Sequence, residues 1–234
     1  MAKLAGSIAS EIDAMTKLKR NSLMLPGPAG MLEAVVTYPH ADRRPCVVAI
    51  AHPHPLHGGS MNNKVVHYLA KSFNDLGATA LRFNFRGVGK SAGEYGHGHG
   101  ETDDLIAVVE WLNGVYPRYD IWLAGFSFGA YVALRVSHLL PVKGLITIAP
   151  PVHLFDCREM TAPSCPWFVV QGTDDPIVSS NEVTAWLAKA TPMPSVVNMD
   201  RVGHFFHGRL NDLQHVATEF LLPYLNPSAT PATP

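Results

Sequence analysis

One stretch of the chain restricts its fold more than any other: a serine flanked by glycines, with an apolar run on each side. The run Tyr119–Ala124 has the length of a buried strand, and Phe128–Leu140 is apolar or small at nearly every position, which is typical of a buried helix. Pro117 precedes the first run and Pro141 ends the second. The pattern predicts a strand, a tight turn and a helix, with Ser127 at the turn.

A serine at such a turn is a candidate nucleophile, because the strained backbone holds its hydroxyl clear of the sheet. Side chains at positions 125 and 129 would collide with neighbouring elements, so Gly125 and Gly129 are both required. The helix that begins at Phe128 points its amide dipoles toward the negative charge that develops in acyl transfer. Since this pentapeptide arises by accident in roughly one such chain in ten, the assignment of Ser127 depends on partners elsewhere in the chain.

Composition excludes several classes of protein. A chain of 234 residues that is 47% hydrophobic and 16% charged is an ordinary globular protein, for which one domain is expected. Its net charge of −1 gives no attraction to nucleic acid or an anionic membrane, so neither partner is expected. No apolar run has the length of a membrane span, and the first 20 residues lack the pattern of a signal peptide. Three cysteines without a CxxC pair favour a reducing compartment, and we expect a cytoplasmic protein.

Strands and helices alternate along most of the chain. Beyond the elements around Ser127, expected strands are a hairpin within Ser22–Pro39, then Cys46–Ala51, Ala78–Phe85, Val142–Ala149, Trp167–Gln171 and Ser195–Asp200. Expected helices are Asn62–Leu76, one starting at Glu101 or Thr102, Glu182–Ala190 and Arg209–Leu222. This order predicts an α/β fold with a mostly parallel sheet covered on both faces. We expect one domain over residues 21–225, an N-terminal extension at 1–20 and a disordered tail at 226–234.

A serine nucleophile needs a histidine base and an acid that orients it. Asp174 and Asp175 directly follow the expected strand Trp167–Gln171, and His204 and His207 follow the last expected strand. Loops at the carboxyl ends of parallel strands meet at one edge of the sheet, where sites are built. The order serine, aspartate, histidine is the one that a nucleophile turn of this type demands.

At this point the chain resembles the α/β-hydrolase family. The acid loop of that family typically reads glycine, two residues, aspartate, often proline, and valine three residues after the aspartate. Placed on Gly172–Val178, the resemblance implies Asp175 as the orienting acid, with Asp174 as the alternative. The glycine before His204 matches the usual base of the family, which favours His204 over His207.

Three segments extend this resemblance over about residues 22 to 224: HPHPLHGGSMNNKVV, LRFNFRGVGKSAGE and GETDD. They are similar to a small bacterial branch of the α/β-hydrolases, predicted serine hydrolases with an HPHP loop. The resemblance implies serine hydrolase chemistry and leaves the physiological substrate open. Family members that sequester greasy substrates usually insert a lid after the strand that follows the nucleophile helix. Here Pro150–Pro166 is too short for one, so we expect an open site without interfacial activation.

Acyl transfer also requires two backbone donors for the oxyanion. One is expected to be the amide of Phe128, directly after the nucleophile. The second is expected in the loop after Cys46–Ala51, where Pro53 and Pro55 have no N–H to donate. His54 is therefore the first candidate and Leu56 the second.

Twelve histidines, several of them in HPHPLH and HGHG, raise the question of a metal site. No carboxylate or thiolate stands at a recognisable metal spacing from them, so we expect no metal. We expect His52 and His57 to brace their loop by hydrogen bonds, and His97 and His99 to lie on a mobile surface loop. Gly87-Val88-Gly89 lacks the third glycine and the downstream acid of a dinucleotide site.

Together these features predict a serine hydrolase that cleaves small, accessible carboxylic esters through an acyl-enzyme. Ser127 attacks, His204 transfers the proton, Asp175 orients His204, and the amides of Phe128 and His54 bind the oxyanion. We expect a small-molecule acyl substrate, no cofactor, and a monomer or homodimer. A thioesterase or amidase with the same triad is the alternative within enzymes, and a binding protein that has lost catalysis is the alternative of another class.

Overall fold

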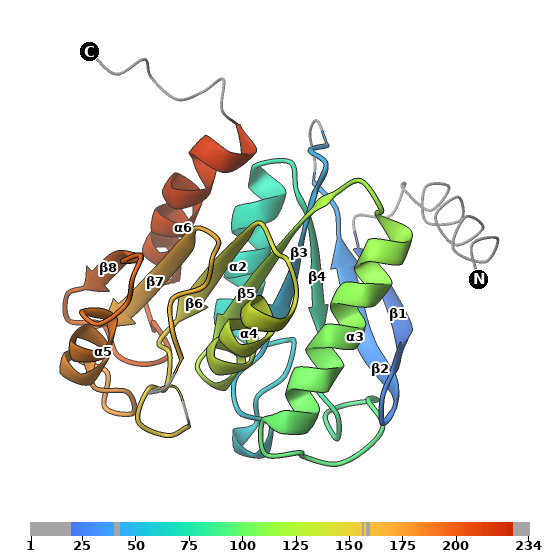
Figure 1. Cartoon of the computed structure of the whole chain (residues 1–234), viewed down its shortest axis with the longest axis horizontal. Coiled ribbons are helices and arrows are strands. Elements are labelled where there is room, and N and C mark those ends of the chain that lie inside the picture. The colour runs from blue at the N-terminus through green and yellow to red at the C-terminus, as the bar shows by residue number, and fades with distance from the viewer. Residues whose placement is uncertain (1–19, 40–42, 156, 158–159, 227–234) are drawn as a thin grey trace.

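One eight-stranded sheet, in the order β1-β2-β4-β3-β5-β6-β7-β8, forms the centre of the protein (Figure 1). The computed structural model describes residues 20–39, 43–155, 157 and 160–226. The predictions for residues 1–19 and for the tail from residue 227 lie outside this range. The strands are β1 (Arg20–Gly27), β2 (Gly30–Thr37), β3 (Cys46–Ala51), β4 (Thr79–Phe83), β5 (Asp120–Phe126), β6 (Gly144–Ile148), β7 (Trp167–Gly172) and β8 (Ser195–Met199).

Strand pairing follows the predicted pattern. β1 and β2 form an antiparallel hairpin that ends with Gly27 opposite Gly30, and β2 pairs antiparallel with β4. All the remaining neighbours are parallel. The predicted hairpin and the mostly parallel sheet are therefore confirmed.

Helices cover both faces of the sheet. They are α2 (Lys64–Asp75), α3 (His99–Val115), α4 (Phe128–Leu139), α5 (Ser180–Leu187) and α6 (Leu210–Leu225), with a short 3₁₀ helix η1 (Pro55–His57). One buried apolar layer joins the sheet to α3, α4 and α5, and a second joins it to α2 and α6 (Figure 1). Every residue of β3, β6 and β7 is buried, as expected for strands covered on both faces. None of the described helices is long and apolar enough to cross a membrane.

Helix boundaries differ from the prediction by up to three residues; α5, for example, spans Ser180–Leu187 rather than Glu182–Ala190. α3 begins at His99 rather than at Glu101 or Thr102, because the Glu101 carboxylate accepts the N–H groups of Gly96 and Gly98 from inside the first turn. α6 continues through Pro223 to Leu225, whereas the prediction ended it at Leu222. These shifts do not move the loops that follow the parallel strands, which meet at the lower edge of the sheet in Figure 1.

Candidate active site

Ser127 lies on the sharp turn between β5 and α4. Its backbone has φ 52° and ψ −119°, in a region that side-chain-bearing residues rarely adopt. The strain is held by structure on both sides, since the Ser127 N–H donates to the carbonyl of Ile148 and its own carbonyl accepts the N–H of Ala130, each at 2.8 Å. The side chain is almost fully buried, at 8% exposure.

The two glycines beside this turn are required by contact with backbone atoms. A Cβ on Gly125 would lie 2.1 Å from the carbonyl oxygen of Gly129, and a Cβ on Gly129 would lie 2.3 Å from that of Ala51. Both distances are far below any real carbon–oxygen contact. The steric reason predicted for these glycines is therefore confirmed.

Ser127, His204 and Asp175 form one connected hydrogen-bonded chain. The Ser127 Oγ lies 3.0 Å from His204 Nε2, and His204 Nδ1 lies 2.7 Å from Asp175 Oδ2. The histidine ring packs against Phe126 with ring centroids 5.0 Å apart, which limits its rotation. Loops after three different parallel strands thus place a hydroxyl, an imidazole and a carboxylate in series.

The surroundings of Asp175 keep its carboxylate ionised. Burial raises the pKa of this carboxyl, but hydrogen bonds from His204 and from the Val178 and Ile177 amides outweigh it, and the pKa falls below its usual value. A further contact was not predicted from the sequence: Gln171 Nε2 lies 3.2 Å from Asp175 Oδ2 and 3.0 Å from the carbonyl of Val178. A polar residue at the end of an otherwise apolar run is the signal that could have pointed to Gln171, since a polar side chain buried there needs hydrogen-bond partners.

The competing residues lie outside this chain of hydrogen bonds. Asp174 is exposed, and its carboxylate accepts only a local hydrogen bond from Thr173 among the contacts of the described residues. His207 is exposed and stacks on Phe205, with ring centroids 5.9 Å apart. The geometry therefore favours Asp175 over Asp174 and His204 over His207.

Backbone hydrogen bonds distinguish the two candidate oxyanion donors in the HPHP loop, His54 and Leu56. The Leu56 N–H donates to His54 Nδ1 at 3.2 Å, so this amide is already engaged within its own loop. The Phe128 amide is the first of α4 and has no acceptor within the helix. His54 and Phe128 also contact each other through their rings, with centroids 5.0 Å apart. Engagement of the Leu56 amide leaves His54 as the candidate donor in this loop, beside Phe128.

A buried histidine anchors the HPHP loop. His52 has no exposed surface, its Nδ1 lies 2.6 Å from the carbonyl of Pro53, and its Nε2 accepts the N–H of Phe85 at 3.1 Å. Burial lowers the pKa of His52 to about 4, so the ring is neutral with its hydrogen on Nδ1. The predicted bracing by His52 is confirmed. His57 instead contacts the ring of His54, with centroids 4.6 Å apart.

Ser127 and His204 open into a cavity of about 520 Å³. Three apolar side chains at its rim are exposed to solvent: Leu154, Ile177 and Phe205. The described part of the segment between β6 and β7 contains no α-helix that could cover the mouth. The site is therefore open.

Comparison with known proteins identifies the group to which this architecture belongs. An α/β serine hydrolase homologue from Coxiella burnetii is 44% identical, with a TM-score of 0.84 over 86% of this chain and 97% of that one. The chain belongs to the α/β serine hydrolase family. A family model for serine aminopeptidases of the S33 type matches residues 54–158 of this hydrolase.

Two more relatives extend the similarity over most of this α/β serine hydrolase. A member of the family without a lid, from Xanthomonas campestris, is 43% identical, with a TM-score of 0.85 over 92% of this chain and 97% of that one. The uncharacterized protein RP471 of Rickettsia prowazekii is 34% identical over 209 residues, which is 84% of this chain and 86% of that protein. The fold, the family and the absence of a lid agree with the sequence analysis.

A second support of the HPHP loop in this α/β serine hydrolase comes from Tyr95, whose Oη lies 3.1 Å from His54 Nε2. Burial lowers the pKa of His54, which favours the neutral ring. Since His54 Nδ1 accepts the amide of Leu56, its hydrogen lies on Nε2 and is donated to Tyr95. Tyr95 was not predicted to contact this loop, because no local pattern places it against a residue 41 positions away in the chain.

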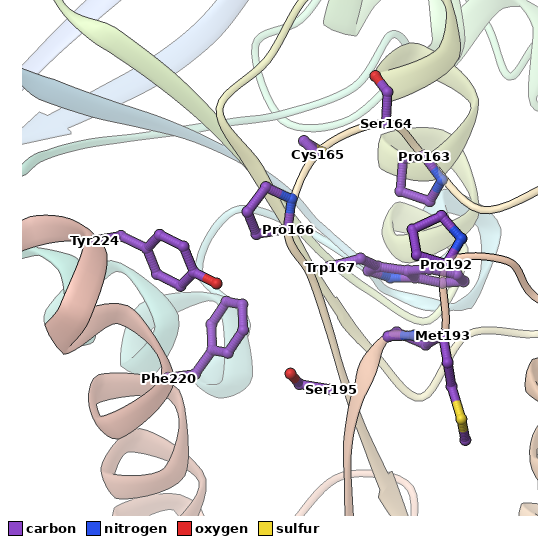
Figure 2. Close-up of a pocket in the computed structure, with 11 residues that line it drawn as sticks. Pro163, Ser164, Cys165, Pro166, Trp167, Pro192, Met193, Ser195, Phe220 and Tyr224 are labelled. Carbon is purple, nitrogen blue, oxygen red and sulfur yellow. The ribbon is translucent and has the colours of Figure 1, made fainter. Parts of the chain in front are cut away.

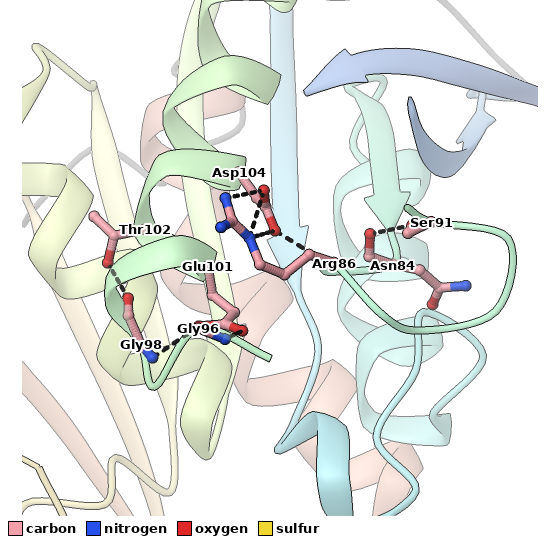
Figure 3. A network of polar contacts seen from close by, with 8 residues as sticks. All are labelled: Asn84, Arg86, Ser91, Gly96, Gly98, Glu101, Thr102 and Asp104. Atoms are coloured by element: carbon pink, nitrogen blue, oxygen red, sulfur yellow. Dashed lines mark hydrogen bonds and ion pairs between the residues drawn. The ribbon is translucent and has the colours of Figure 1, made fainter. Parts of the chain in front are cut away.

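The loop that carries Tyr95 is itself held by buried charge (Figure 3). Arg86 binds Asp104 on α3 with its Nη2 2.8 Å from the carboxylate, and the Arg86 N–H donates to the same group at 2.9 Å. Asp104 is fully buried, as expected only for a carboxylate with an ion-pair partner. Glu101 accepts the N–H groups of Gly96 and Gly98 at 2.8 and 2.7 Å. His99 belongs to α3 rather than to the loop, which corrects the prediction for it.

A second hollow, of about 290 Å³, lies near the amino ends of β7 and β8 (Figure 2). Prolines and aromatic residues line it, including Trp167, Phe220 and Tyr224, and no histidine or carboxylate does so among its described lining residues. Elsewhere in the described part of the chain, no group of three or more histidine, cysteine, aspartate or glutamate side chains is arranged to hold a metal ion.

Proposed function

We propose that this protein is a serine esterase that cleaves uncharged carboxylic esters through an acyl-enzyme. The observation that carries the proposal is the relay from Ser127 Oγ to His204 Nε2 at 3.0 Å and from His204 Nδ1 to Asp175 at 2.7 Å, at the base of an open cavity. A serine hydroxyl activated in this way attacks acyl carbons. Phe128 and His54 supply the amide donors for the oxyanion.

The reaction proceeds in two balanced halves. Ser127 Oγ bonds to the ester carbonyl carbon while His204 Nε2 takes its proton, and the carbonyl oxygen becomes the oxyanion. As the carbonyl re-forms, the bond to the alcohol oxygen breaks and His204 donates the proton to that oxygen. Water then adds to the acyl-enzyme by the same steps, releasing the carboxylic acid and restoring the Ser127 hydroxyl. Asp175 stays ionised and stabilises the charged imidazole.

The lining of the cavity favours esters over peptides with a free amino terminus. An aminopeptidase must bind the protonated amine of its substrate, which a nearby carboxylate does most effectively. Among the described lining residues there is no aspartate, glutamate, lysine or arginine. An uncharged substrate matches this lining better than a peptide does.

Replacing the nucleophile tests the proposal. Ser127→Ala is expected to lower kcat on short-chain aryl esters at least about 10⁴-fold while the melting temperature stays close to that of the wild type. Ser164→Ala, at an exposed serine in the second hollow, serves as the matched control and keeps full activity. Turnover in the Ser127 variant equal to that of the wild type contradicts the proposal.

Thioesters and amides can be cleaved by the same relay, so the bond type needs its own measurement. Rates on a matched ester, thioester and amide with one acyl group compare the three directly. The ester is expected to be turned over fastest, with no sharp rise in rate above the solubility limit of a lipid substrate, because the site has no lid. A cytoplasmic location and a monomeric or homodimeric state stay predictions.

A further inference from the structure

Ser127 lies between two loops that pack on opposite faces of the sheet. After β6, Val152 and Cys157 belong to the apolar layer beneath α3, α4 and α5, and Phe155 packs against that layer. After β8, Val202 and Phe206 belong to the other layer, beneath α2 and α6. Leu154 from the first loop and Phe205 from the second both line the cavity that contains Ser127.

The side formed by the first loop adjoins the proposed oxyanion donors. The Phe155 ring lies 5.4 Å from that of Phe128 and 6.4 Å from that of His54, measured between centroids. It also stacks on Tyr131 at 4.6 Å, which holds it in place. Leu154 extends this apolar wall toward solvent and is 55% exposed. We call Leu154 and Phe155 the acyl wall.

The side formed by the second loop adjoins the proposed base. The Phe205 ring meets the His204 ring edge to face, with centroids 5.1 Å apart, and lies 6.2 Å from that of Phe126. Its side chain is 45% exposed, so it can cover a group that enters from solvent. Phe205 is thus the apolar surface next to the atom that must deliver a proton.

Proton transfer assigns the two sides. The alcohol oxygen of an ester leaves only when His204 Nε2 can donate to it, so this oxygen and its carbon substituent lie on the His204 side. The acyl carbon stays bonded to Ser127 Oγ with its carbonyl oxygen toward the amides of Phe128 and His54, and its substituent lies beside them. We propose that the acyl wall binds the acyl group and that Phe205 binds the departing alcohol. The substrate class is then an uncharged ester with apolar groups on both sides of the carbonyl. This inference rests on the proposed esterase function.

Four esters measure the assignment: the methyl and benzyl esters of acetic and hexanoic acid. Leu154 and Phe205 are a matched pair, because each is an exposed apolar residue and its truncation leaves the core intact. Phe205→Ala is expected to lower the benzyl-to-methyl ratio of kcat/KM roughly three- to tenfold with either acid, and to change the hexanoyl-to-acetyl ratio less than about twofold. Leu154→Ala is expected to lower the hexanoyl-to-acetyl ratio of kcat/KM roughly three- to tenfold with either alcohol, and to change the benzyl-to-methyl ratio less than about twofold.

A second measurement uses only the acyl-enzyme. Once the alcohol has left, an added alcohol can take the place of water and re-form an ester by the reverse of the first half-reaction. The donor is methyl hexanoate and the added acceptor is benzyl alcohol. Phe205→Ala is expected to lower the yield of benzyl hexanoate relative to hexanoic acid roughly three- to tenfold. Leu154→Ala is expected to leave this ratio unchanged, since both products carry the same acyl group.

The outcomes separate this inference from the proposal beneath it. If a fluorophosphonate probe labels Ser127 and the esters are hydrolysed, but the effects of the two variants are exchanged or absent, the two-sided assignment is overturned and the esterase function stands. If wild-type Ser127 is not labelled and no ester is hydrolysed, both the esterase function and the two-sided assignment are rejected. Labelling together with the stated ratios supports both.

Discussion

The two ends of the central sheet each carry an apolar hollow, and the described lining residues include histidine at one end but not at the other. At the carboxyl ends of the strands, a cavity of about 520 Å³ contains the Ser127–His204 pair. Near the amino ends of β7 and β8, a hollow of about 290 Å³ is lined by prolines, aromatic residues and two serines, Ser164 and Ser195. A serine beside an apolar cavity is common to both ends.

The difference lies in what supports each serine. Ser127 is held at φ 52° on a turn, faces a buried imidazole, and has a helix N-terminus beside it. The second hollow has no histidine or carboxylate among its described lining residues. Reactivity in this fold therefore depends on loops that bring titratable groups together at one end of the sheet, and apolar volume alone does not create it.

The largest contrast is expected within the acid loop itself. Asp175→Asn is expected to lower kcat on aryl esters about 10⁴-fold, because the amide no longer selects the productive tautomer of His204. Asp174→Asn, one residue away and exposed, is expected to stay within about twofold of the wild type, as for surface changes outside the relay. Steady-state kinetics at neutral pH measure both. A larger loss of kcat in Asp174→Asn than in Asp175→Asn would mean that Asp174, and not Asp175, orients His204.

The next effect concerns stability and pH. His52 is buried and neutral with a folded-state pKa of about 4 against an ordinary 6.5, so the unfolded chain binds more protons between these values. Stability is therefore lost as the pH falls from 6.5 to 4, by roughly 3 kcal/mol from this one group. Urea unfolding across this range measures the slope.

His52→Asn removes that titration and is expected to flatten the slope. The exposed His138 on α4 supplies the control, His138→Asn, which is expected to keep the slope of the wild type. An unchanged slope in the His52 variant would show that other groups cause the loss of stability in acid.

A smaller effect is expected from the support behind the HPHP loop. Tyr95→Phe removes the acceptor for the Nε2 hydrogen of His54, and we expect kcat to fall roughly fivefold, the equivalent of one neutral hydrogen bond, with KM unchanged. Tyr119→Phe, before β5 at the other end of the sheet, is the control. A change in KM alone would show that Tyr95 affects binding rather than the orientation of the oxyanion donor.

The smallest effect is expected at the second hollow. Met193→Ala removes an exposed side chain from its lining and is expected to change kcat/KM on any ester by less than about twofold, as is usual for surface sites. A large loss of esterase activity in this variant would break the contrast between the two ends of the sheet.

The fold could be predicted from the sequence because its signals are local. The buried strands are short apolar runs bounded by glycine, proline or polar residues, and the nucleophile turn contains glycines whose positions no other residue can occupy. Ser127, Asp175 and His204 each follow a predicted strand, in the order that a nucleophile turn of this type demands. This order can be recognised in the sequence without knowledge of tertiary contacts.

What could not be predicted depends on contacts between distant segments. Gln171 beside Asp175, Tyr95 beside His54 and Asp104 beside Arg86 each follow from how loops pack, and their own neighbours in sequence give little sign of it. Choosing between Asp174 and Asp175 likewise required the family pattern. In the structure the choice is plain, because one carboxylate is buried and the other is exposed.

The most direct test of the account is to find which residue a fluorophosphonate probe modifies. The probe reacts much faster with a serine that an adjacent base activates than with other serines, and mass spectrometry of the digested protein locates the adduct. We predict a single stoichiometric adduct on Ser127 in the wild type, which is lost in a folded His204→Gln variant. Wild-type protein that is folded but unlabelled at Ser127, or labelled equally in the His204 variant, would contradict the account.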